Sequence, residues 1–225
     1  MLIESPKNLI PYFFDNTAKT YDRVVFLATF GKDHYWKKEI VDKIENANSI
    51  LDLACGTGIL TRKIAEKFPQ SKITGVDISK SYLKVATTKS LPNISFILQD
   101  AEKINLNEKF DCICSSYIPK YCNSKVLIKR CIDHLNPNGV IIFHDFVYPK
   151  KNLVQILWKL HFVLLRFIGN FIPSWKFAFS ELPRLIQKSR WVDEYTQELE
   201  KFGFDVMQQN LTWNSSVILH TRKNI

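Results

Sequence analysis

A glycine turn and the acidic residue that precedes it have types and spacing suited to binding a ligand. Asp52 lies in the apolar run LDLA, which leads into a turn made of Gly56, Thr57 and Gly58. Glycines let the backbone approach a ligand closely because no Cβ stands in the way. A Walker loop would end in Gly-Lys-Ser/Thr, and a dinucleotide fingerprint would have a third glycine where this chain has Leu60. The turn therefore predicts a site for a small ligand and lacks a complete phosphate-binding motif.

Two further acids follow the next two strand-like runs. Asp77 ends the run KITGVD and could accept hydrogen bonds from two ribose hydroxyls, while Asp100 follows ISFILQ and could accept from an adenine amino group. Asp52 could accept, directly or through water, from the ammonium group of a methionine moiety. The Ala101 amide would donate to the purine ring, and Ile78 would pack on its face. Each acid alone could be a helix cap or turn residue, but three at successive strand ends favour S-adenosylmethionine as the ligand.

The elements that must position these residues alternate between strand and helix patterns from Ser49 onward. Strand-like runs are SILDLA, KITGVD, ISFIL, FDCICSS and GVIIFHDF. Helical patterns cover 59–68 and 83–88, and a third helix opens at Ser124 with Leu127, Cys131 and Leu135 on one stripe. Five strands joined by crossovers predict an α/β fold with a mostly parallel, doubly wound sheet and helices on both faces.

The end of the chain predicts a reversed last strand. An amphipathic helix over 192–202 precedes the run DVMQQNLTW, a turn at 214–216 and the run VILHTRK, which together form a hairpin. We expect a single domain over 1–225. Its parts are an N-terminal helical lid (10–47), a cofactor-binding core (48–149), an apolar insertion on the substrate side (151–190), and a final helix with the hairpin (191–225).

Composition bounds the class of protein without deciding its partner. The chain has 225 residues and a formal net charge of +9, which suits nucleic acid, an anionic membrane surface or only a lysine-rich exterior. Five cysteines, an odd number, lack zinc-ligand spacing, so we expect buried, reduced thiols and no metal site. The N-terminus does not resemble a secretory signal, which predicts a cytoplasmic protein.

Together these residues resemble the class I S-adenosylmethionine-dependent methyltransferases. Their acid-x-Gly-x-Gly-x-Gly pattern corresponds to residues 52–58 here, with Ala54 at the first glycine. Within that superfamily the chain resembles the ubiquinone/menaquinone biosynthesis C-methyltransferases over about 13–223. The matching runs, in order, are FFDNTAKTYDRVVFLATFGKDHYW, DISKSYLK, QDAE, FDCICSSY, LNPNGVIIFHDF and NLTWNSSVILH.

The resemblance implies which residues contact the cofactor and where the substrate side departs from the family. It assigns S-adenosylmethionine contacts to Thr57, Asp77, Asp100, Ala101 and Ser116, and it gives Tyr21 the role of closing the pocket from the lid. The family's Gly-x-Arg-Asn becomes Ile118-Pro119-Lys120-Tyr121, and its Glu-Phe-Ser becomes Asp145-Phe146-Val147. Its Met-Asn after Tyr-Asp-x becomes Val24-Val25.

The candidate catalytic residues follow from methylation of a ring carbon. A hydroquinone must lose a phenolic proton to become nucleophilic, and a nearby cation or base assists that step. Lys120, at the position of the family's arginine, could stabilise the phenolate, although a lysine lacks the planar fork of arginine. Asp145, His144 and His34 are the other acid/base candidates. His144 and Asp145 point to opposite faces if the strand continues, so at most one of them faces the pocket.

The segment 151–190 and the choice of acceptor leave alternatives open. The run VQILWKLHFVLLRFIGNFIPSW is apolar around nearly the whole helix, and Lys150, Lys151, Lys176, Arg184, Lys188 and Arg190 flank it. It suits burial under a lid, an anionic membrane surface or a prenyl tail, or a homodimer contact. The leading hypothesis is C-methylation of a small lipophilic quinone precursor such as demethylmenaquinone. The alternatives are O- or N-methylation of another metabolite, RNA methylation, and S-adenosylmethionine binding without turnover. Nucleic acid is disfavoured because Ser115-Ser116-Tyr117-Ile118 replaces the Asp/Asn-Pro-Pro-aromatic motif of exocyclic-amine methyltransferases.

Overall fold

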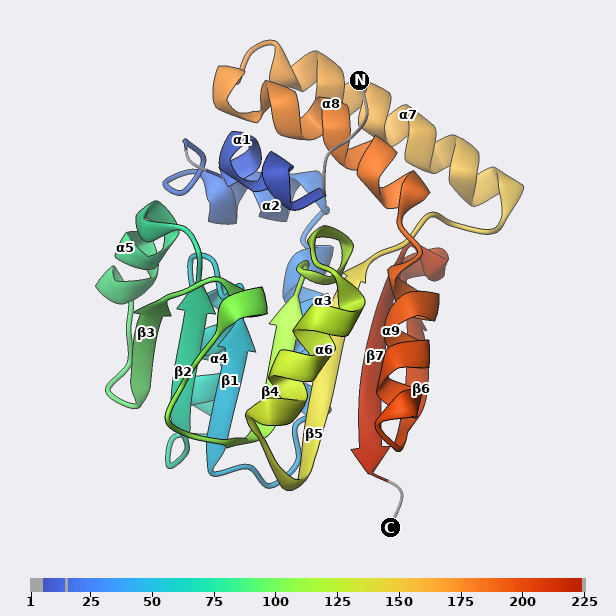
Figure 1. Ribbon diagram of the computed structural model, residues 1–225. Coiled ribbons are helices and arrows are strands. Elements are labelled where there is room, and N and C mark those ends of the chain that lie inside the picture. The colour runs from blue at the N-terminus through green and yellow to red at the C-terminus, as the bar shows by residue number, and fades with distance from the viewer. Residues whose placement is uncertain (1–5, 15, 224–225) are drawn as a thin grey trace.

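The computed structural model describes residues 6–14 and 16–223. Asp15, which belongs to the N-terminal pattern above, lies outside the described residues. The described chain forms a seven-stranded sheet between two helical layers, and further helices form a cap over the carboxyl ends of the parallel strands (Figure 1).

The sheet has the predicted mostly parallel topology. Its strand order is β3-β2-β1-β4-β5-β7-β6, and β1 to β5 run parallel to one another. β7 runs antiparallel to both β5 and β6, so the reversed strand lies between them. The strands are β1 (Ser49–Leu53), β2 (Lys72–Asp77), β3 (Ile94–Leu98), β4 (Phe110–Ser116), β5 (Leu135–Phe146), β6 (Phe204–Leu211) and β7 (Ser216–Lys223).

Each face of the sheet is buried by its own set of helices. α3 (Lys32–Asp42) and α4 (Ile59–Lys67) cover one face, while α6 (Ser124–Asp133) and α9 (Trp191–Lys201) cover the other. α5 (Lys80–Thr88) packs beside β2 and β3. Side chains along β4 alternate between the two faces of the sheet. Cys112 and Cys114 pack with α3 and α4, while Ile113 packs with α6 and α9 on the other face. All five cysteines are free thiols.

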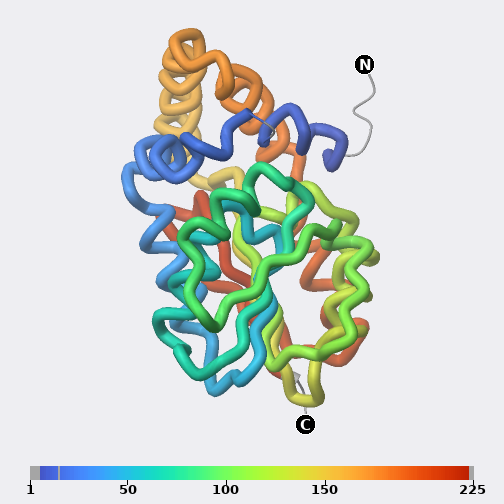
Figure 2. Tube along the Cα trace, turned by 90° about the vertical axis from the view of Figure 1, so that its left-hand side faces the viewer, coloured from blue at the N-terminus to red at the C-terminus, as the bar shows by residue number. Residues whose placement is uncertain are grey.

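A cap of helices lies over the carboxyl ends of the parallel strands. It contains η1 (Pro6–Leu9), α1 (Ile10–Phe14), α2 (Tyr21–Ala28), α7 (Asn152–Gly169) and α8 (Pro173–Lys188). The N-terminal helices and the α7–α8 hairpin are far apart in sequence but pack on each other, as both views show (Figures 1 and 2). Phe13, Trp175, Phe179 and Ile186 are buried between them. The structure thus joins the predicted lid and the predicted insertion in one layer.

Three local expectations differ from the structure. α6 ends at Asp133, so Leu135 begins β5 instead of continuing the helical stripe. α3 lies inside the span predicted as a lid, but Trp36, Ile40 and Val41 pack in the core under the sheet. The hairpin turn is a short helical segment, η4 (Thr212–Asn214), whose three residues all have positive φ. The other short segments are η2 (Ala101–Lys103) and η3 (Pro119–Tyr121).

Candidate active site

The turn after β1 is held by backbone and side-chain hydrogen bonds around Asp77. The Gly56 amide donates to the Asp77 carboxylate at 2.8 Å, and the Ser79 amide donates to the other carboxylate oxygen at 2.8 Å. Gly58 caps α4 with φ +76°, and Ala54 adopts φ +53° at the position of the family's first glycine. Burial raises the pKa of Asp77 despite these hydrogen bonds. Each oxygen of Asp77 has one backbone donor and keeps a lone pair for a ligand hydroxyl.

Asp52 lies beneath this turn and is fully enclosed. Its carboxylate accepts a hydrogen bond from the Thr61 hydroxyl at 2.6 Å. Burial raises the pKa of Asp52 to about 7, and the Thr61 hydrogen bond offsets part of that rise. Asp52 lies under the turn and does not line the neighbouring cavity, so of the two expected contacts with a ligand, direct and through water, this geometry does not provide the direct one.

The third acid, Asp100, is engaged by a cation from the cap. Lys7 Nζ donates to the two oxygens of Asp100 at 2.7 and 2.6 Å and also contacts Glu102. Asp100 accepts a hydrogen bond from the Glu102 amide at 3.0 Å as the cap of η2. Lys7 therefore lies at the position where an adenine amino group was expected to donate to Asp100.

A cavity of about 90 Å³ lies where the three strand ends meet the cap. Seven of the ten residues expected to bind the cofactor line it: Tyr21, Gly56, Asp77, Ile78, Asp100, Ala101 and Ser116. Asp52, Thr57 and Gly58 lie outside its lining. The Thr57 hydroxyl instead donates to Asp22 of α2 at 2.5 Å, and Thr17 and Tyr82 share a hydrogen bond of 2.6 Å between their hydroxyls. The cap is thus tied to the turn and to α5 at the rim of this cavity.

The donor and acceptor groups of the cavity suit S-adenosylmethionine. Carboxylates at the ends of β2 and β3 can accept from ribose hydroxyls and an amino group, whereas a polyphosphate would be repelled by them. Gly56 has φ +57°, a conformation that L side chains rarely adopt, and without a Cβ its backbone can approach a ligand closely. Asp77 would hold the ribose, and the turn at Gly56 would face the methionine part.

A larger cavity of about 770 Å³ adjoins the first one inside the cap. Its walls come from α2, α3, α7, α8 and the η4 turn, and most of the lining side chains are apolar or aromatic. They include Phe13, Val25, Phe30, Trp36, Phe146, Leu157, Trp158, Phe162, Leu165, Trp175, Phe179 and Trp213. Such a lining suits a large lipophilic molecule.

Four aromatic rings belong to both cavities. Phe14, Tyr21, Tyr117 and Tyr121 line the small cavity on one side and the large cavity on the other. Tyr117 adopts φ +77°, a strained conformation for a residue with a large side chain, at the end of β4. The rings thus mark the point where a methyl group could pass from a cofactor to an acceptor.

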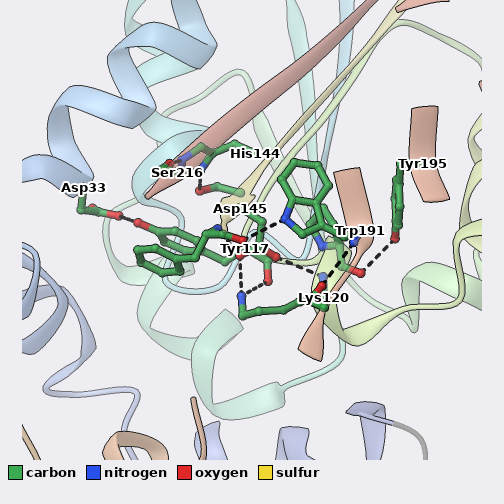
Figure 3. A network of polar contacts seen from close by, with 12 residues as sticks. Asp33, Tyr117, Lys120, His144, Asp145, Trp191, Tyr195 and Ser216 are labelled. Carbon is green, nitrogen blue, oxygen red and sulfur yellow. Dashed lines mark hydrogen bonds and ion pairs between the residues drawn. The ribbon is translucent and has the colours of Figure 1, made fainter. Parts of the chain in front are cut away.

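A buried ion pair lies next to these rings (Figure 3). Lys120 Nζ donates to Asp145 Oδ1 at 2.7 Å and to the Tyr117 carbonyl at 2.9 Å, and the Lys120 amide donates to Asp145 Oδ2 at 3.1 Å. Burial lowers the pKa of Lys120 and raises that of Asp145, while the mutual attraction opposes both changes. Lys120 lines the large cavity, and Asp145 lies behind it without lining either cavity.

The histidine candidates lie elsewhere. His144 is fully buried between the hydroxyls of Ser116 and Ser216, at 2.9 and 2.6 Å (Figure 3). Burial holds its pKa well below the usual value, which keeps the imidazole neutral. His34 packs on Phe26 and lines neither cavity. These positions favour Lys120, with Asp145 behind it, over either histidine at the substrate side.

The sequence did not reveal two groups that line the small cavity, Lys7 and Tyr117, or the ion pair that contacts Tyr117. Lys7 reaches Asp100 from 93 positions away, a pairing that no local pattern predicts. Tyr117 donates to Asp33 at 2.7 Å, and Asp33 is also paired with Lys37 on the same buried stretch of α3. The four-residue spacing of Asp33 and Lys37 is a signal that could have indicated this helix pair.

Comparison with known proteins finds a methyltransferase family model and methyltransferase relatives. The family model described as a methyltransferase domain matches residues 50–139. The demethylmenaquinone methyltransferase of Chlorobaculum tepidum is 28% identical over 223 residues, covering 94% of this chain and 91% of the relative. The ubiquinone/menaquinone biosynthesis C-methyltransferase UbiE of Rickettsia bellii is 28% identical over 228 residues, covering 96% and 92%. The malonyl-[acyl-carrier protein] O-methyltransferase of Bacillus anthracis is 31% identical over 145 residues, which cover 62% of this chain and 53% of that protein.

The fold is shared with solved methyltransferases. The DhpI–SAH complex superimposes with a TM-score of 0.66 at 15% identity, and the superposition covers 97% of this chain and 96% of the DhpI chain. The plantazolicin methyltransferase BpumL gives a TM-score of 0.67 at 14% identity, with coverage of 97% and 95%. The family model, the relatives and the shared fold together indicate an S-adenosylmethionine-dependent methyltransferase. Over most of its length the chain is similar to the quinone-pathway enzymes named above.

Proposed function

We propose that this methyltransferase transfers a methyl group to a ring carbon of a small lipophilic quinone precursor, such as demethylmenaquinone. The observation that carries the proposal is the position of Lys120 between the shared aromatic rings and the large apolar cavity. The similarity to demethylmenaquinone methyltransferases over nearly the whole chain supports the same acceptor class.

The chain's own groups account for the control of one proton and one developing charge. Bound S-adenosylmethionine supplies an activated methyl group on a sulfonium. Lys120 Nζ has three donors, of which Asp145 and the Tyr117 carbonyl use two, so one remains for an acceptor oxygen. A phenolate formed from a hydroquinone would be stabilised by that ammonium, whose side chain is only 2% exposed. Asp145 would keep the ammonium oriented.

The aromatic rings and the apolar cavity would fix the acceptor's position. Methyl transfer is an in-line displacement, so the reacting ring carbon must lie behind the methyl group. Tyr21, Tyr117 and Tyr121 lie at the junction of the two cavities, and the walls of the large cavity can hold a prenyl tail. After C–C bond formation the ring carbon loses its proton to solvent or to a base, which restores the aromatic ring.

The direct test is turnover with isotope-labelled S-adenosylmethionine and a demethylated quinol in detergent, with mass spectrometry of the product. We expect a methyl group on ring carbon. Lys120→Met should lower kcat by about 100-fold while cofactor binding changes less than twofold, because a charge that stabilises the reacting phenolate is lost.

The matched control is Lys67→Met, which removes another lysine that donates to an aspartate and to a backbone carbonyl, those of Asp42 and Val41, but lines neither cavity. It should retain kcat under conditions where it remains folded. Equal losses in the two variants, or label recovered in RNA instead of lipid, would contradict the proposal.

O-methylation is the second candidate because of the similarity to a malonyl-[acyl-carrier protein] O-methyltransferase over 62% of the chain. A methyl ester is released by mild alkali, whereas a methyl group on ring carbon is not. Alkali-labile label with an acyl-carrier substrate, and none with the quinol, would favour this second candidate.

A further inference from the structure

The outer face of α7 is an exposed apolar stripe. Six of its side chains are between 50% and 70% exposed: Leu153, Ile156, Leu160, Val163, Leu164 and Phe167. They recur every three or four residues, so they lie on one side of the helix. The opposite side carries Phe162, Leu165 and Gly169, which are buried within the cap. α7 is thus apolar on a face that the rest of the described chain leaves uncovered.

Aromatic side chains extend this stripe at its border and beyond the end of the helix. Phe171, 72% exposed, contacts Phe167 with 5.4 Å between ring centroids. Phe30, 77% exposed, contacts His161 of α7 at 5.3 Å and also lines the large cavity. A contiguous apolar surface of this kind marks a contact with a partner or a membrane.

The charges around the stripe have one sign. The segment from Phe146 to Ser180 contains Lys150, Lys151, Lys159, Arg166 and Lys176, and no Asp or Glu. All five cations are exposed, and none of them takes part in an ion pair within residues 6–14 and 16–223. Lys159 and Arg166 are seven residues apart and therefore follow one border of the stripe. This arrangement is complementary to an anionic surface.

We propose that the outer face of α7 binds the surface of an anionic lipid bilayer. Apolar side chains would enter the interface between headgroups and acyl chains, while the bordering cations would contact the headgroups. By length and composition α7 could cross a membrane, but its inner face packs on α8 and lines the large cavity, so it lies along the surface. A symmetric contact between two copies would bring the same cations together with no acid from this segment to offset them.

The position of α7 links the membrane surface to the large cavity. Trp158, Phe162 and Leu165 line the cavity from the inner side of the same helix that exposes Leu160 and Leu164 outward. Leu157 lines the cavity and is also 47% exposed. One helix therefore separates the cavity from the bilayer, and α7 and α8 form the end of the molecule farthest from the C-terminus (Figure 1). A lipophilic molecule could pass from the bilayer to the cavity without crossing water.

Vesicle flotation tests the surface without requiring turnover. The wild-type protein should bind vesicles of phosphatidylcholine with phosphatidylglycerol, and at least tenfold more weakly vesicles of phosphatidylcholine alone. Binding should fall as salt rises, because screening weakens the headgroup contacts. Leu160→Glu, or Lys159→Glu with Arg166→Glu, should weaken binding to the anionic vesicles by at least tenfold.

Matched controls lie on α6, which packs on the sheet and is not part of the cap. Val126→Glu places the same charge on another exposed apolar position, and Lys125→Glu with Lys129→Glu makes the same change in net charge. Both should bind like the wild type. A fluorophore on Leu160→Cys should report an apolar environment with vesicles, whereas one on Val126→Cys should not, which keeps the test valid if a charged variant fails to fold.

Two results would overturn the proposal. One is absence of binding to the anionic vesicles by the wild-type protein. The other is a concentration-dependent dimer that Leu160→Glu abolishes while vesicle binding is missing, which would make this face a contact between copies.

A second arm rests on the proposed acceptor. Leu160→Glu should slow methylation of a quinol embedded in vesicles but leave a short-chain, water-soluble analogue unaffected. If the protein binds vesicles but does not methylate the quinol, the proposed membrane-binding surface is supported and the proposed acceptor is contradicted.

Discussion

Asp52 combines complete burial with a titratable carboxyl group. It is 1% exposed and has the Thr61 hydroxyl as its side-chain donor. Burial disfavours the charged form and raises the pKa to about 7 from an ordinary value of 3.8. The folded protein therefore holds a proton on Asp52 over a pH range in which the unfolded chain has lost it.

Replacing Asp52 by Asn should change how stability depends on pH. Below about pH 4 the carboxyl is protonated in both states and contributes nothing. As pH rises through 4 toward 7 the unfolded state loses its proton first, so the carboxyl progressively destabilises the fold. One unit of difference in pKa is worth about 1.4 kcal/mol, so the cost reaches roughly 4 kcal/mol at neutral pH and above. Asp52→Asn, which can still accept from Thr61, avoids this cost.

The measurement is urea unfolding of both proteins from pH 4 to pH 8. The difference in unfolding free energy should grow in favour of Asp52→Asn as pH rises and level off above 7. Asp145 also has a raised pKa, but both proteins contain it, so it cancels in the difference. The charge of Asp77 contributes to the raised pKa of Asp52, so that repulsion is part of the expected difference. Parallel curves would show that Asp52 has an ordinary pKa in the folded state.

Local pattern indicated the cavity-lining acids but not their partners. Asp77, Asp100 and Ala101 line the small cavity because Asp77 ends one strand of the parallel sheet and the other two residues follow the next strand, positions that the alternation of strands and helices predicts. Lys120 lines the large cavity at the expected substrate side. Two pairings, Lys7 with Asp100 and Thr57 with Asp22, depend on how the cap packs over the sheet. No local spacing in the sequence predicts that packing.

The turn between β1 and α4 depends on a left-handed residue in close contact with its surroundings. Gly58 has φ +76°, and a Cβ built on it would lie 3.2 Å from both Ala86 and Phe96. A side chain would therefore add crowding to the strain of the left-handed conformation. Gly58→Ala should lower the unfolding free energy by about 2–4 kcal/mol and weaken S-adenosylmethionine binding, as measured by urea unfolding and calorimetry.

Gly203, after α9, is the matched control. It has φ +79°, but a Cβ there would meet nothing within 4 Å. Gly203→Ala should cost only the backbone strain, about 1–2 kcal/mol, and leave cofactor binding unchanged. If the two variants lost equal stability, crowding at the β1–α4 turn would be negligible.

The spacing of apolar residues predicted whether each element is a helix or a strand, whereas tertiary contacts determine where each element ends and what it packs on. The five parallel strands and the reversed strand are confirmed because apolar runs bounded by turns are strong signals. The predicted extent of α6 was wrong, because Leu135 has the correct helical spacing but pairs with Phe110 in the sheet. α3 was grouped with the lid because its apolar spacing shows that one face is buried but not what covers it.

The cap as a whole closes over the cofactor cavity through a few polar contacts. Lys7, Ile10, Phe14 and Tyr21 form one side of that cavity. The remaining ties between the cap and the sheet include the hydrogen bonds from Thr57 to Asp22 and between Thr17 and Tyr82. Most of the cap's apolar cluster lies within the cap, with Tyr121 and Phe146 as contacts from the sheet layer, so we expect the cap to move as a unit when these ties open. Cofactor exchange is then expected to depend on their strength.

Asp22→Ala should therefore speed cofactor release without unfolding the protein. Asp22 accepts from Thr57 at 2.5 Å and from Lys89 at 3.2 Å, and both contacts join α2 to the sheet layer. A hydrogen bond to a charged group contributes about 1.5–3 kcal/mol, which corresponds to a release rate at least tenfold faster. Stopped-flow displacement of bound S-adenosylhomocysteine measures that rate, and amide exchange in residues 16–28 should increase in the same variant.

The control is Asp42→Ala, which removes an aspartate paired with Lys38 and Lys67 away from the cavity. Its release rate should equal that of the wild type. Equal rates in Asp22→Ala and the wild type would mean that the apolar cluster alone holds the cap closed. Faster release together with unchanged amide exchange would place the effect in the turn at Thr57 instead of in the cap. Only a joint increase in release and exchange in Asp22→Ala identifies movement of the cap as the step through which the cofactor leaves.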